Sequence, residues 1–292
     1  MNGREATAKR ERRRSSCCST AGLKRDCCRS TSRLSSSRRS SWERQAPAWR
    51  FSQQGRVSVH RTQRRPGWSL ALPGEKPLHP SGIVFDLDGT LIDSRHDLAT
   101  AVNRLRAELG MAPLAIDVVV GMVGEGARTL VSRALGPDFP PDRFEAAFSS
   151  YRSFYRDVCL DATVPYKGIP ELLAELSPRY PLAVLTNKGE QLSRVILEGL
   201  GLARYFRAVV GGDSLPARKP DPGGLVHLAD LFGVPVESVL LVGDSRFDAE
   251  TAQAAGCRFA LVEWGFATPE EQEEMAEDLK VRTAGALAAA LT

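Results

Sequence analysis

Residues 82–94 read GIVFDLDGTLIDS, an apolar run that ends in two aspartates separated by one residue. An apolar run followed by Asp and Gly is typical of a buried parallel strand that ends in a turn. Asp86 and Asp88 are therefore expected at the carboxyl end of this strand. In open parallel sheets, ligands bind beyond that edge.

Strand and helix patterns alternate downstream of residue 180. The predicted strands cover residues 181–187, 206–213, 238–245 and 258–265, and the predicted helices cover 190–201, 221–233 and 246–256. Such alternation predicts a parallel sheet with right-handed crossovers and helices on both faces. The expected fold class is therefore α/β, with a Rossmann-like, doubly wound parallel sheet as its core.

A different pattern separates the first strand from the others. Apolar residues recur at helical spacing over residues 96–110, 126–135 and 142–157, and no strand is expected in this block. The sequence therefore predicts an α/β core of residues 80–94 and 166–292, with a helical domain of residues 95–165 inserted after the first strand.

Polar side chains gather at the predicted strand ends. They are Asp86 and Asp88 after the first strand, Thr186 and Asn187 after the second, Lys219 in the loop after the third and Asp244 after the fourth. A single Asp in such a place is often a helix cap or a turn former. Several carboxylates and a lysine that converge on one edge are not explained by capping, so a functional site is expected there.

Carboxylates in one crevice need a cation, because like charges at close range oppose each other's ionisation. An all-oxygen site with few protein ligands suits Mg²⁺, which retains water and binds substrate phosphate. With Lys219 and the metal offsetting the charge, one aspartate of the D-x-D pair can attack phosphorus while the other protonates the leaving oxygen. Thr186 and the backbone amides near Asn187 can hold the phosphoryl oxygens.

Four segments carry a resemblance to a known family. FDLDGTLIDS (85–94), LTNK (185–188), RKPDP (218–222) and VGDSRFD (242–248) resemble, in the expected order, the four motifs of the haloacid dehalogenase-like hydrolase superfamily. The resemblance covers residues 81–292. It implies that the inserted block of residues 95–165 is a cap that closes over the site and selects the substrate.

The same resemblance implies a role for each motif residue. Asp86 would be the nucleophile that forms an aspartyl-phosphate, Asp88 the general acid and base, and Lys219 the group that stabilises the transferring phosphoryl. Thr186 and Asn187 would bind phosphate. Asp86, the backbone carbonyl of Asp88 and Asp244 would hold Mg²⁺, with Asp248 assisting directly or through water.

One candidate substrate contact lies in the cap. VGEGARTL (123–130) places two glycines beside Arg128. Arg128 is interpreted either as a side chain that reaches the active site when the cap closes or as part of an ordinary helix start after a glycine turn.

The substrate is suggested by longer stretches. GGDSLPARKPDP (211–222) and VGDSRFDAETAQAAG (242–256) resemble phosphoglycolate phosphatases, which hydrolyse 2-phosphoglycolate to glycolate and phosphate. Lys167 departs from that family, which usually has Pro at this place. Phosphatases of sugar phosphates or nucleotides, and a phosphomutase of the same fold, remain alternatives. A dehalogenase is disfavoured because its reaction needs neither the second aspartate nor the metal.

Charge divides the chain into two parts. Residues 1–79 hold 19 Lys and Arg against 5 Asp and Glu, whereas residues 80–292 hold 20 against 30. The first part is an Arg- and Ser-rich tail without an apolar pattern, and disorder is expected for it. It is interpreted as upstream sequence joined by a misplaced start, with an organellar transit peptide and a nucleic-acid-binding arm as alternatives. The acidic remainder is not expected to bind nucleic acid.

Cysteine content and hydropathy limit the expected cellular location of the protein. Four of the six cysteines lie in the tail. The two outside it, Cys159 and Cys257, are far apart in the sequence and give no disulfide framework, which favours a reducing cytoplasm. An organelle is the alternative if the tail is a transit peptide. No apolar run is long enough to predict a membrane span. The expected partner is a small-molecule phosphate ester, and the oligomeric state stays open.

Overall fold

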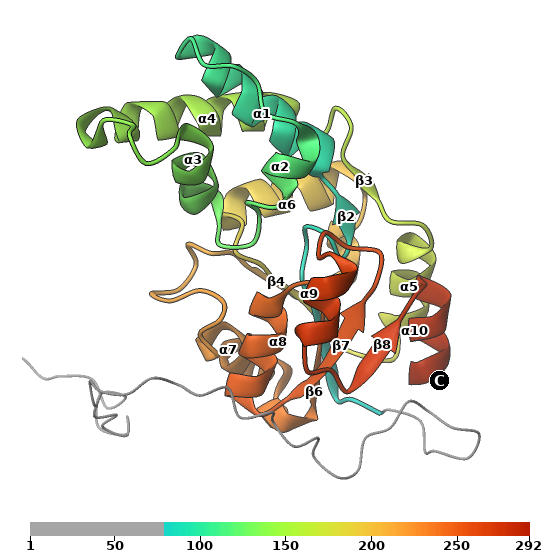
Figure 1. The fold of residues 1–292 in the computed structure, drawn as a ribbon. Coiled ribbons are helices and arrows are strands. Elements are labelled where there is room, and N and C mark those ends of the chain that lie inside the picture. Colours follow the sequence, from blue (N-terminus) through green and yellow to red (C-terminus); the bar gives the residue numbers. More distant parts are fainter. Residues whose placement is uncertain (1–78) are drawn as a thin grey trace, which may run out of the picture. The chain divides into compact units, whose positions relative to one another are not determined.

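The computed structural model describes residues 79–292, which form an α/β core and a helical insert (Figure 1). Apart from its last residue, the basic tail predicted over residues 1–79 lies outside the described part of the chain. Within residues 79–292, none of the helices combines the length and the apolar character that crossing a bilayer requires.

A parallel sheet of six strands organises the core. Its strands are β1 (Gly82–Phe85), β4 (Leu182–Leu185), β5 (Ala208–Val210), β6 (Val239–Gly243), β7 (Arg258–Val262) and β8 (Leu279–Val281). They lie in the order β5-β4-β1-β6-β7-β8. Strand β1 pairs with β4 and β6, so its carboxyl end lies near the middle of the sheet edge. The five predicted strands are confirmed, and the short β8 is an addition.

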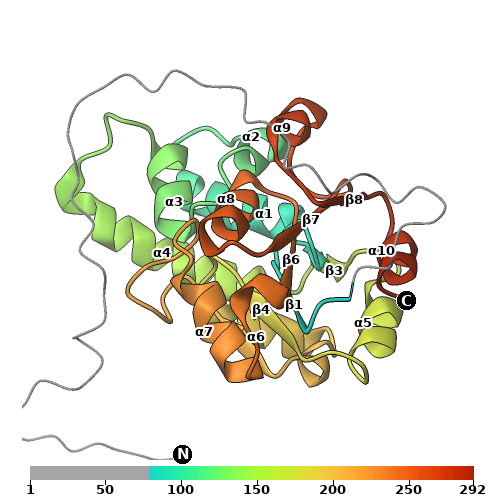
Figure 2. The same ribbon diagram turned by 90° about the horizontal axis from the view of Figure 1, so that it is seen from below.

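Helices cover both faces of this sheet, as the doubly wound prediction requires. Because side chains alternate along a strand, Ile83 and Phe85 of β1 enter one apolar cluster and Val84 enters the other. Helices α5 (Ile169–Leu176), α6 (Glu190–Gly199) and α10 (Ala284–Leu291) contribute to the first cluster. Helices α7 (Gly223–Phe232) and α8 (Arg246–Ala255) contribute to the second. In Figure 2 the strands run between α7 and α8 on one side and α5 and α10 on the other.

Four helices make up the insert. They are α1 (Arg95–Glu108), α2 (Ile116–Val120), α3 (Ala127–Leu135) and α4 (Phe144–Val158). The helices expected over residues 96–110, 126–135 and 142–157 correspond to α1, α3 and α4 and are confirmed. The remaining helices within residues 79–292 are the one-turn helices Pro141–Arg143, Ala203–Tyr205 and Val236–Ser238, and the short helix α9 (Pro269–Glu274).

The chain enters and leaves the insert through a pair of very short strands. Strand β2 (Ile92–Asp93) pairs antiparallel with β3 (Val164–Pro165). The prediction that residues 95–165 contain no strand is therefore wrong at its end, because two residues are too few to show a strand period. The buried Asp97 fastens this neck: its carboxylate accepts hydrogen bonds from the backbone N–H and the hydroxyl of Thr163, at 2.8 and 2.6 Å.

Candidate active site

Three buried aspartates meet at the carboxyl edge of the sheet. Asp86 follows β1, Asp244 follows β6, and Asp248 lies in the first turn of α8. One carboxylate oxygen from each lies within 4.8 Å of those from the other two. The strand-end convergence predicted from the sequence is therefore present for Asp86 and Asp244, and Asp248, which the family resemblance added, lies with them.

Glycines allow the backbone to approach Asp244 closely. Gly89 has a φ of +84°, and a Cβ there would lie 2.3 Å from Oδ2 of Asp244. A Cβ at Gly265 would lie 2.2 Å from Cβ of Asp244. The hydroxyl of Thr90 and the backbone N–H of Phe266 donate to the two Asp244 oxygens, at 2.9 and 2.7 Å. The Asp244 carboxylate is thus held in one orientation.

Lys219 bridges the other two aspartates. Its Nζ lies 2.7 Å from Oδ1 of Asp86 and 2.6 Å from Oδ1 of Asp248, and its side chain is 2% exposed. The second oxygen of Asp248 accepts from the backbone N–H and hydroxyl of Ser245, at 3.1 and 2.6 Å. The bond from the backbone N–H of Ser245 to Asp248 is one half of a capping box that begins α8. Helix capping and the orientation of Lys219 therefore depend on the same carboxylate.

Burial and mutual repulsion perturb these groups. Desolvation, partly offset by Lys219, raises the pKa of Asp86 above its ordinary value. Desolvation, with the charges of Asp86 and Asp248, raises the pKa of Asp244 to about 8. Burial alone would lower the pKa of Lys219, but the adjacent carboxylates of Asp248 and Asp86 raise it overall. The cluster therefore holds more negative charge than Lys219 alone offsets.

The cluster fits a divalent cation by its chemistry. Carboxylate oxygens are the ligands that Mg²⁺ prefers. Oδ1 of Asp86 is buried and lacks a hydrogen bond of good geometry within residues 79–292, although Nζ of Lys219 is close to it. A cation among Asp86, Asp244 and Asp248 would lower the raised pKa values of the first two.

Thr186 and Asn187 follow β4 at the same edge, and both are buried. The hydroxyl of Thr186 accepts a hydrogen bond from the backbone N–H of Lys188 at 3.2 Å. The side-chain amide of Asn187 donates to the backbone carbonyl of Gly124 in the insert at 2.8 Å and to that of Lys219 at 3.1 Å. Asn187 thus joins three segments, and the phosphate-binding role of both residues stays a prediction.

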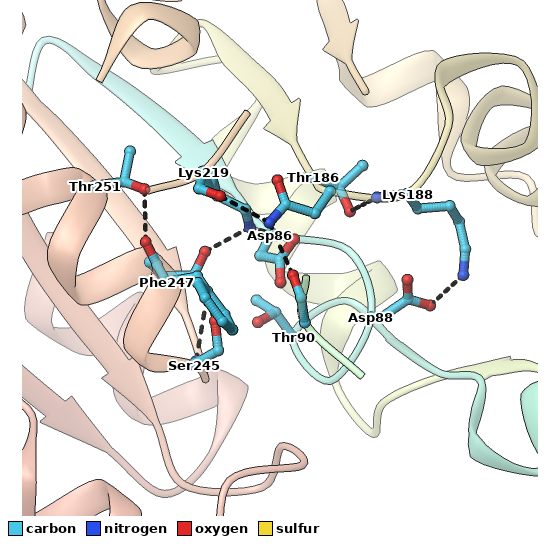
Figure 3. A network of polar contacts seen from close by, with 12 residues as sticks. Asp86, Asp88, Thr90, Thr186, Lys188, Lys219, Ser245, Phe247 and Thr251 are labelled. Carbon is cyan, nitrogen blue, oxygen red and sulfur yellow. Dashed lines mark hydrogen bonds and ion pairs between the residues drawn. The ribbon is translucent and has the colours of Figure 1, made fainter. Parts of the chain in front are cut away.

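Asp88 lies apart from the three-aspartate cluster. Its Oδ1 accepts from the hydroxyl of Ser94 at 2.5 Å and from Nζ of Lys188 at 2.6 Å. Nζ of Lys188 also donates to the hydroxyl of Tyr155 in α4 at 2.7 Å. In the view of Figure 3, Asp88 and Lys188 lie on the opposite side of Asp86 from Ser245.

Sequence reasoning missed Lys188 and Tyr155. Lys188 belongs to the LTNK motif at the end of β4, only two residues after Thr186. This position could have indicated that Lys188 lies near the site. Tyr155 gave none, because a tyrosine at helical spacing in α4 is typical of ordinary core packing. Their contact depends on how the insert lies over the core.

The insert contacts the core beside the site. A Cβ at Gly124 would lie 2.8 Å from the ring of Phe247 in α8, so this glycine packs directly on the ring. Glu125 forms an ion pair with Arg246 at 3.7 Å. Together with the bond from Asn187 to Gly124, these contacts hold the loop before α3 against the edge of the sheet.

Arg128 has partners within the insert. Its guanidinium pairs with Glu145 and lies 5.2 and 5.0 Å from the ring centroids of Phe144 and Phe148. About half of its side chain is exposed, at 51%. No contact joins it to the aspartate cluster among the described residues. In this arrangement Arg128 links α3 to α4, and a role at the substrate stays a prediction.

Comparison with known proteins agrees with this geometry. The family model of haloacid dehalogenase-like hydrolases matches residues 83–262. The chain is 45% identical to a phosphoglycolate phosphatase of Neisseria meningitidis over 193 residues, which are 64% of this chain and 82% of the relative. It is 37% identical to one of Chromobacterium violaceum over 194 residues, 65% of this chain and 87% of the relative.

A solved structure has the same arrangement of elements. The chain matches a crystal structure described as a predicted phosphoglycolate phosphatase of Haemophilus somnus with a TM-score of 0.68 and 28% identity. The match covers 73% of this chain and 98% of the other. The six-stranded core and the helical insert are thus shared over nearly the whole length of that protein.

Proposed function

Because the chain belongs to the haloacid dehalogenase-like hydrolase family, we propose that it is a phosphoglycolate phosphatase, hydrolysing 2-phosphoglycolate to glycolate and phosphate. The observation that carries the proposal is the buried cluster of Asp86, Asp244 and Asp248 with Lys219. The names of the relatives in Neisseria meningitidis and Chromobacterium violaceum support the substrate.

In the proposed mechanism, a carboxylate oxygen of Asp86 attacks phosphorus and the bond between phosphorus and the ester oxygen breaks. Asp88 gives its proton to that ester oxygen, which leaves as the hydroxyl of glycolate. Water then attacks the aspartyl-phosphate and gives a proton to Asp88. Phosphate leaves, and the Asp86 carboxylate and the protonated Asp88 are restored.

Other residues of the site prepare these steps. Lys219, already 2.7 Å from Asp86, would bring positive charge to the transferring phosphoryl group. Thr186 and the backbone amides near Asn187 would hold the phosphoryl oxygens. Asn187 would also keep the insert over the site through its bond to the carbonyl of Gly124. Contact of the insert with the core limits the access of water.

We propose Mg²⁺ as the cofactor of this cluster. Asp86, Asp244 and the backbone carbonyl of Asp88 would hold it, with Asp248 assisting directly or through water. When bound, Mg²⁺ offsets the negative charge of the carboxylates and of the phosphate.

A phosphate-release assay on the full chain with Mg²⁺ tests the proposal. The panel comprises 2-phosphoglycolate, a hexose phosphate, a nucleoside monophosphate and 2-hydroxyethyl phosphate. We expect the highest kcat/KM for 2-phosphoglycolate. A higher kcat/KM for the hexose phosphate or the nucleotide would overturn the substrate and leave the family mechanism standing.

A phosphomutase of the same fold is the second candidate, because it would use the same core residues. It would convert a sugar phosphate to its isomer instead of releasing phosphate. Following a hexose phosphate by phosphorus NMR separates the two activities, since an isomerised ester and inorganic phosphate give different signals.

A further inference from the structure

We propose that Lys188 and Tyr155 form the subsite that binds the carboxylate of the substrate, and that this pair determines the preference for a short phosphorylated acid. The inference rests on the proposed function and assigns its specificity to two residues outside the four-residue cluster of aspartates and Lys219. Both side chains are buried: Tyr155 is 2% exposed, and the side chain of Lys188 is 6% exposed.

Asp88 places the carboxylate of the substrate near Lys188. In the proposed mechanism Asp88 protonates the ester oxygen, so the two groups come within hydrogen-bonding distance. The carboxylate carbon of 2-phosphoglycolate is two bonds from that ester oxygen. Oδ1 of Asp88 is engaged by Ser94 and Lys188, whereas Oδ2 has no hydrogen-bond partner within residues 79–292. A substrate facing Oδ2 therefore has its carboxylate close to Nζ of Lys188.

The ammonium of Lys188 has both a hydrogen-bond donor and a charge to offer a ligand. A lysine ammonium has three N–H donors, and those of Lys188 have two partners in the described part of the chain, Asp88 and Tyr155. One donor remains for a ligand. Lys188 also has a single carboxylate partner, whereas Lys219 has two. In the proposed mechanism Asp88 is protonated when the ester binds, so the buried ammonium of Lys188 then lacks an anionic partner. The carboxylate of the substrate supplies one.

A neighbouring hydroxyl, that of Tyr151, also favours an acceptor at this place. The side-chain oxygen of Tyr151 is buried and has no hydrogen-bond partner in the part of the chain that the structure describes. Its ring stacks on that of Tyr155, with 5.9 Å between centroids. A buried hydroxyl without a partner is unfavourable, and a carboxylate oxygen beside Lys188 would be an acceptor for it.

The insert completes this subsite. Tyr155 and Tyr151 both lie in α4, while Lys188 and Asp88 belong to the core. Nζ of Lys188 also lies 4.8 Å from the centre of the Tyr155 ring, a distance at which a cation and an aromatic ring attract each other. Contact between insert and core is therefore what assembles a binding place for a carboxylate next to the reacting ester.

The test compares two substrates of nearly equal size on the full chain with Mg²⁺. These are 2-phosphoglycolate and 2-hydroxyethyl phosphate, in which a hydroxymethyl group replaces the carboxylate. For Lys188→Met we expect kcat/KM to fall about 10- to 100-fold more for 2-phosphoglycolate than for 2-hydroxyethyl phosphate, the effect of losing a charged hydrogen bond. Tyr155→Phe should change the ratio in the same direction by a smaller factor.

Equal losses on both substrates would overturn the inference, because Lys188 would then act through Asp88 alone. Lys280→Met, in β8 and paired with Glu263, is the control and should leave the ratio unchanged. If Lys188→Met does not fold, as judged by circular dichroism, Tyr155→Phe decides by the same ratio. The preference of the unsubstituted protein tests the proposed function separately: no preference for 2-phosphoglycolate refutes that function, whatever the variants do.

Discussion

Two buried lysines define two regions of the site, and they differ in where their partners come from. Lys219 lies between Asp86 and Asp248, and all three belong to the α/β core. Lys188 lies between Asp88 of the core and Tyr155 of the insert. The region around Lys219 is complete within the core, whereas the region around Lys188 exists only where the insert lies over it.

The two regions are expected to differ in function: the Lys219 region acts on the phosphoryl group, and the Lys188 region selects the substrate. Changes around Lys219 should affect every phosphate ester alike, because all of them share the phosphoryl group. Changes at the contact between insert and core should instead depend on the substrate or alter closure.

The largest expected effect comes from Asp86→Asn. Loss of the attacking carboxylate should lower kcat by at least about 10³-fold on every substrate of the panel, since an amide does not replace the nucleophile. Steady-state phosphate release measures the loss, and circular dichroism checks that the fold persists.

Asp230→Asn is the matched control for that change. Asp230 is an exposed residue of α7, and its substitution should leave kcat within about twofold, as for most surface changes. Substantial turnover by a folded Asp86→Asn protein would refute the aspartyl-phosphate mechanism and with it the assignment of chemistry to the core.

Much of the Lys219 region could be predicted from the sequence. Parallel strands end at one edge, so residues after β1 and β6 meet there once the alternating pattern is recognised. The Lys188 region could not be predicted in this way. Its contact with Tyr155 depends on the packing of α4 over the core, and a buried tyrosine has the same local pattern whether or not it binds a lysine.

The same limit applies to the short elements. Strands β2 and β3 have two residues each and β8 has three, so none is long enough to show a strand period. The contacts of Arg128 could not be predicted from the sequence either, because they are tertiary. The phenylalanines that it covers are one turn apart in α4, which the sequence shows, but their position next to α3 is a property of the fold.

The next largest loss of activity is expected when the contact between insert and core is disturbed. Gly124 has a φ of +124°, and an added Cβ would collide with the ring of Phe247. Gly124→Ala should therefore displace this loop and lower kcat/KM by about 10-fold, a loss of the kind that misplacement far from the chemistry produces. The assay is phosphate release with 2-phosphoglycolate.

Gly110→Ala is the control for backbone strain. Gly110 also has a positive φ, of +71°, but no atom lies within 4 Å of its added Cβ. This variant should lose about 1 kcal/mol of stability and keep its kcat/KM. Equal activity losses in the two variants would show that strain in the insert, and not contact with Phe247, accounts for the effect.

A smaller expected effect is a dependence of the stability of the folded protein on pH and on Mg²⁺. The pKa values of Asp86 and Asp244 in the folded protein lie above their ordinary values. The metal-free folded state therefore binds more protons than the unfolded state between about pH 4 and pH 8. Its stability should fall as pH rises through that range.

Mg²⁺ should reverse this loss because it favours the ionised carboxylates. We expect saturating Mg²⁺ to raise Tm by about 3 to 8 °C at pH 8 and by less than about 2 °C at pH 5. Differential scanning fluorimetry, with and without a chelator, measures both shifts. An equal rise in Tm at the two pH values would place the metal outside this cluster.

The smallest expected effect is that of Arg128→Ala. An exposed ion pair and contacts with two aromatic rings contribute about 1 kcal/mol or less. Urea unfolding should detect this change, and kcat/KM for 2-phosphoglycolate should stay within about twofold of the unsubstituted value. A fall of more than about 10-fold in kcat/KM would mean that Arg128 reaches the substrate when the protein turns over.

The neck formed by β2 and β3 has a consequence for engineering. The chain leaves the core at Ile92–Asp93 and returns beside it at Val164–Pro165. Anything spliced between these two points meets two adjacent ends and leaves the order of the sheet strands untouched. The insert can therefore be replaced as a unit. Grafting the insert of a relative at the neck would exchange the tyrosines of α4 while retaining the aspartates of the core.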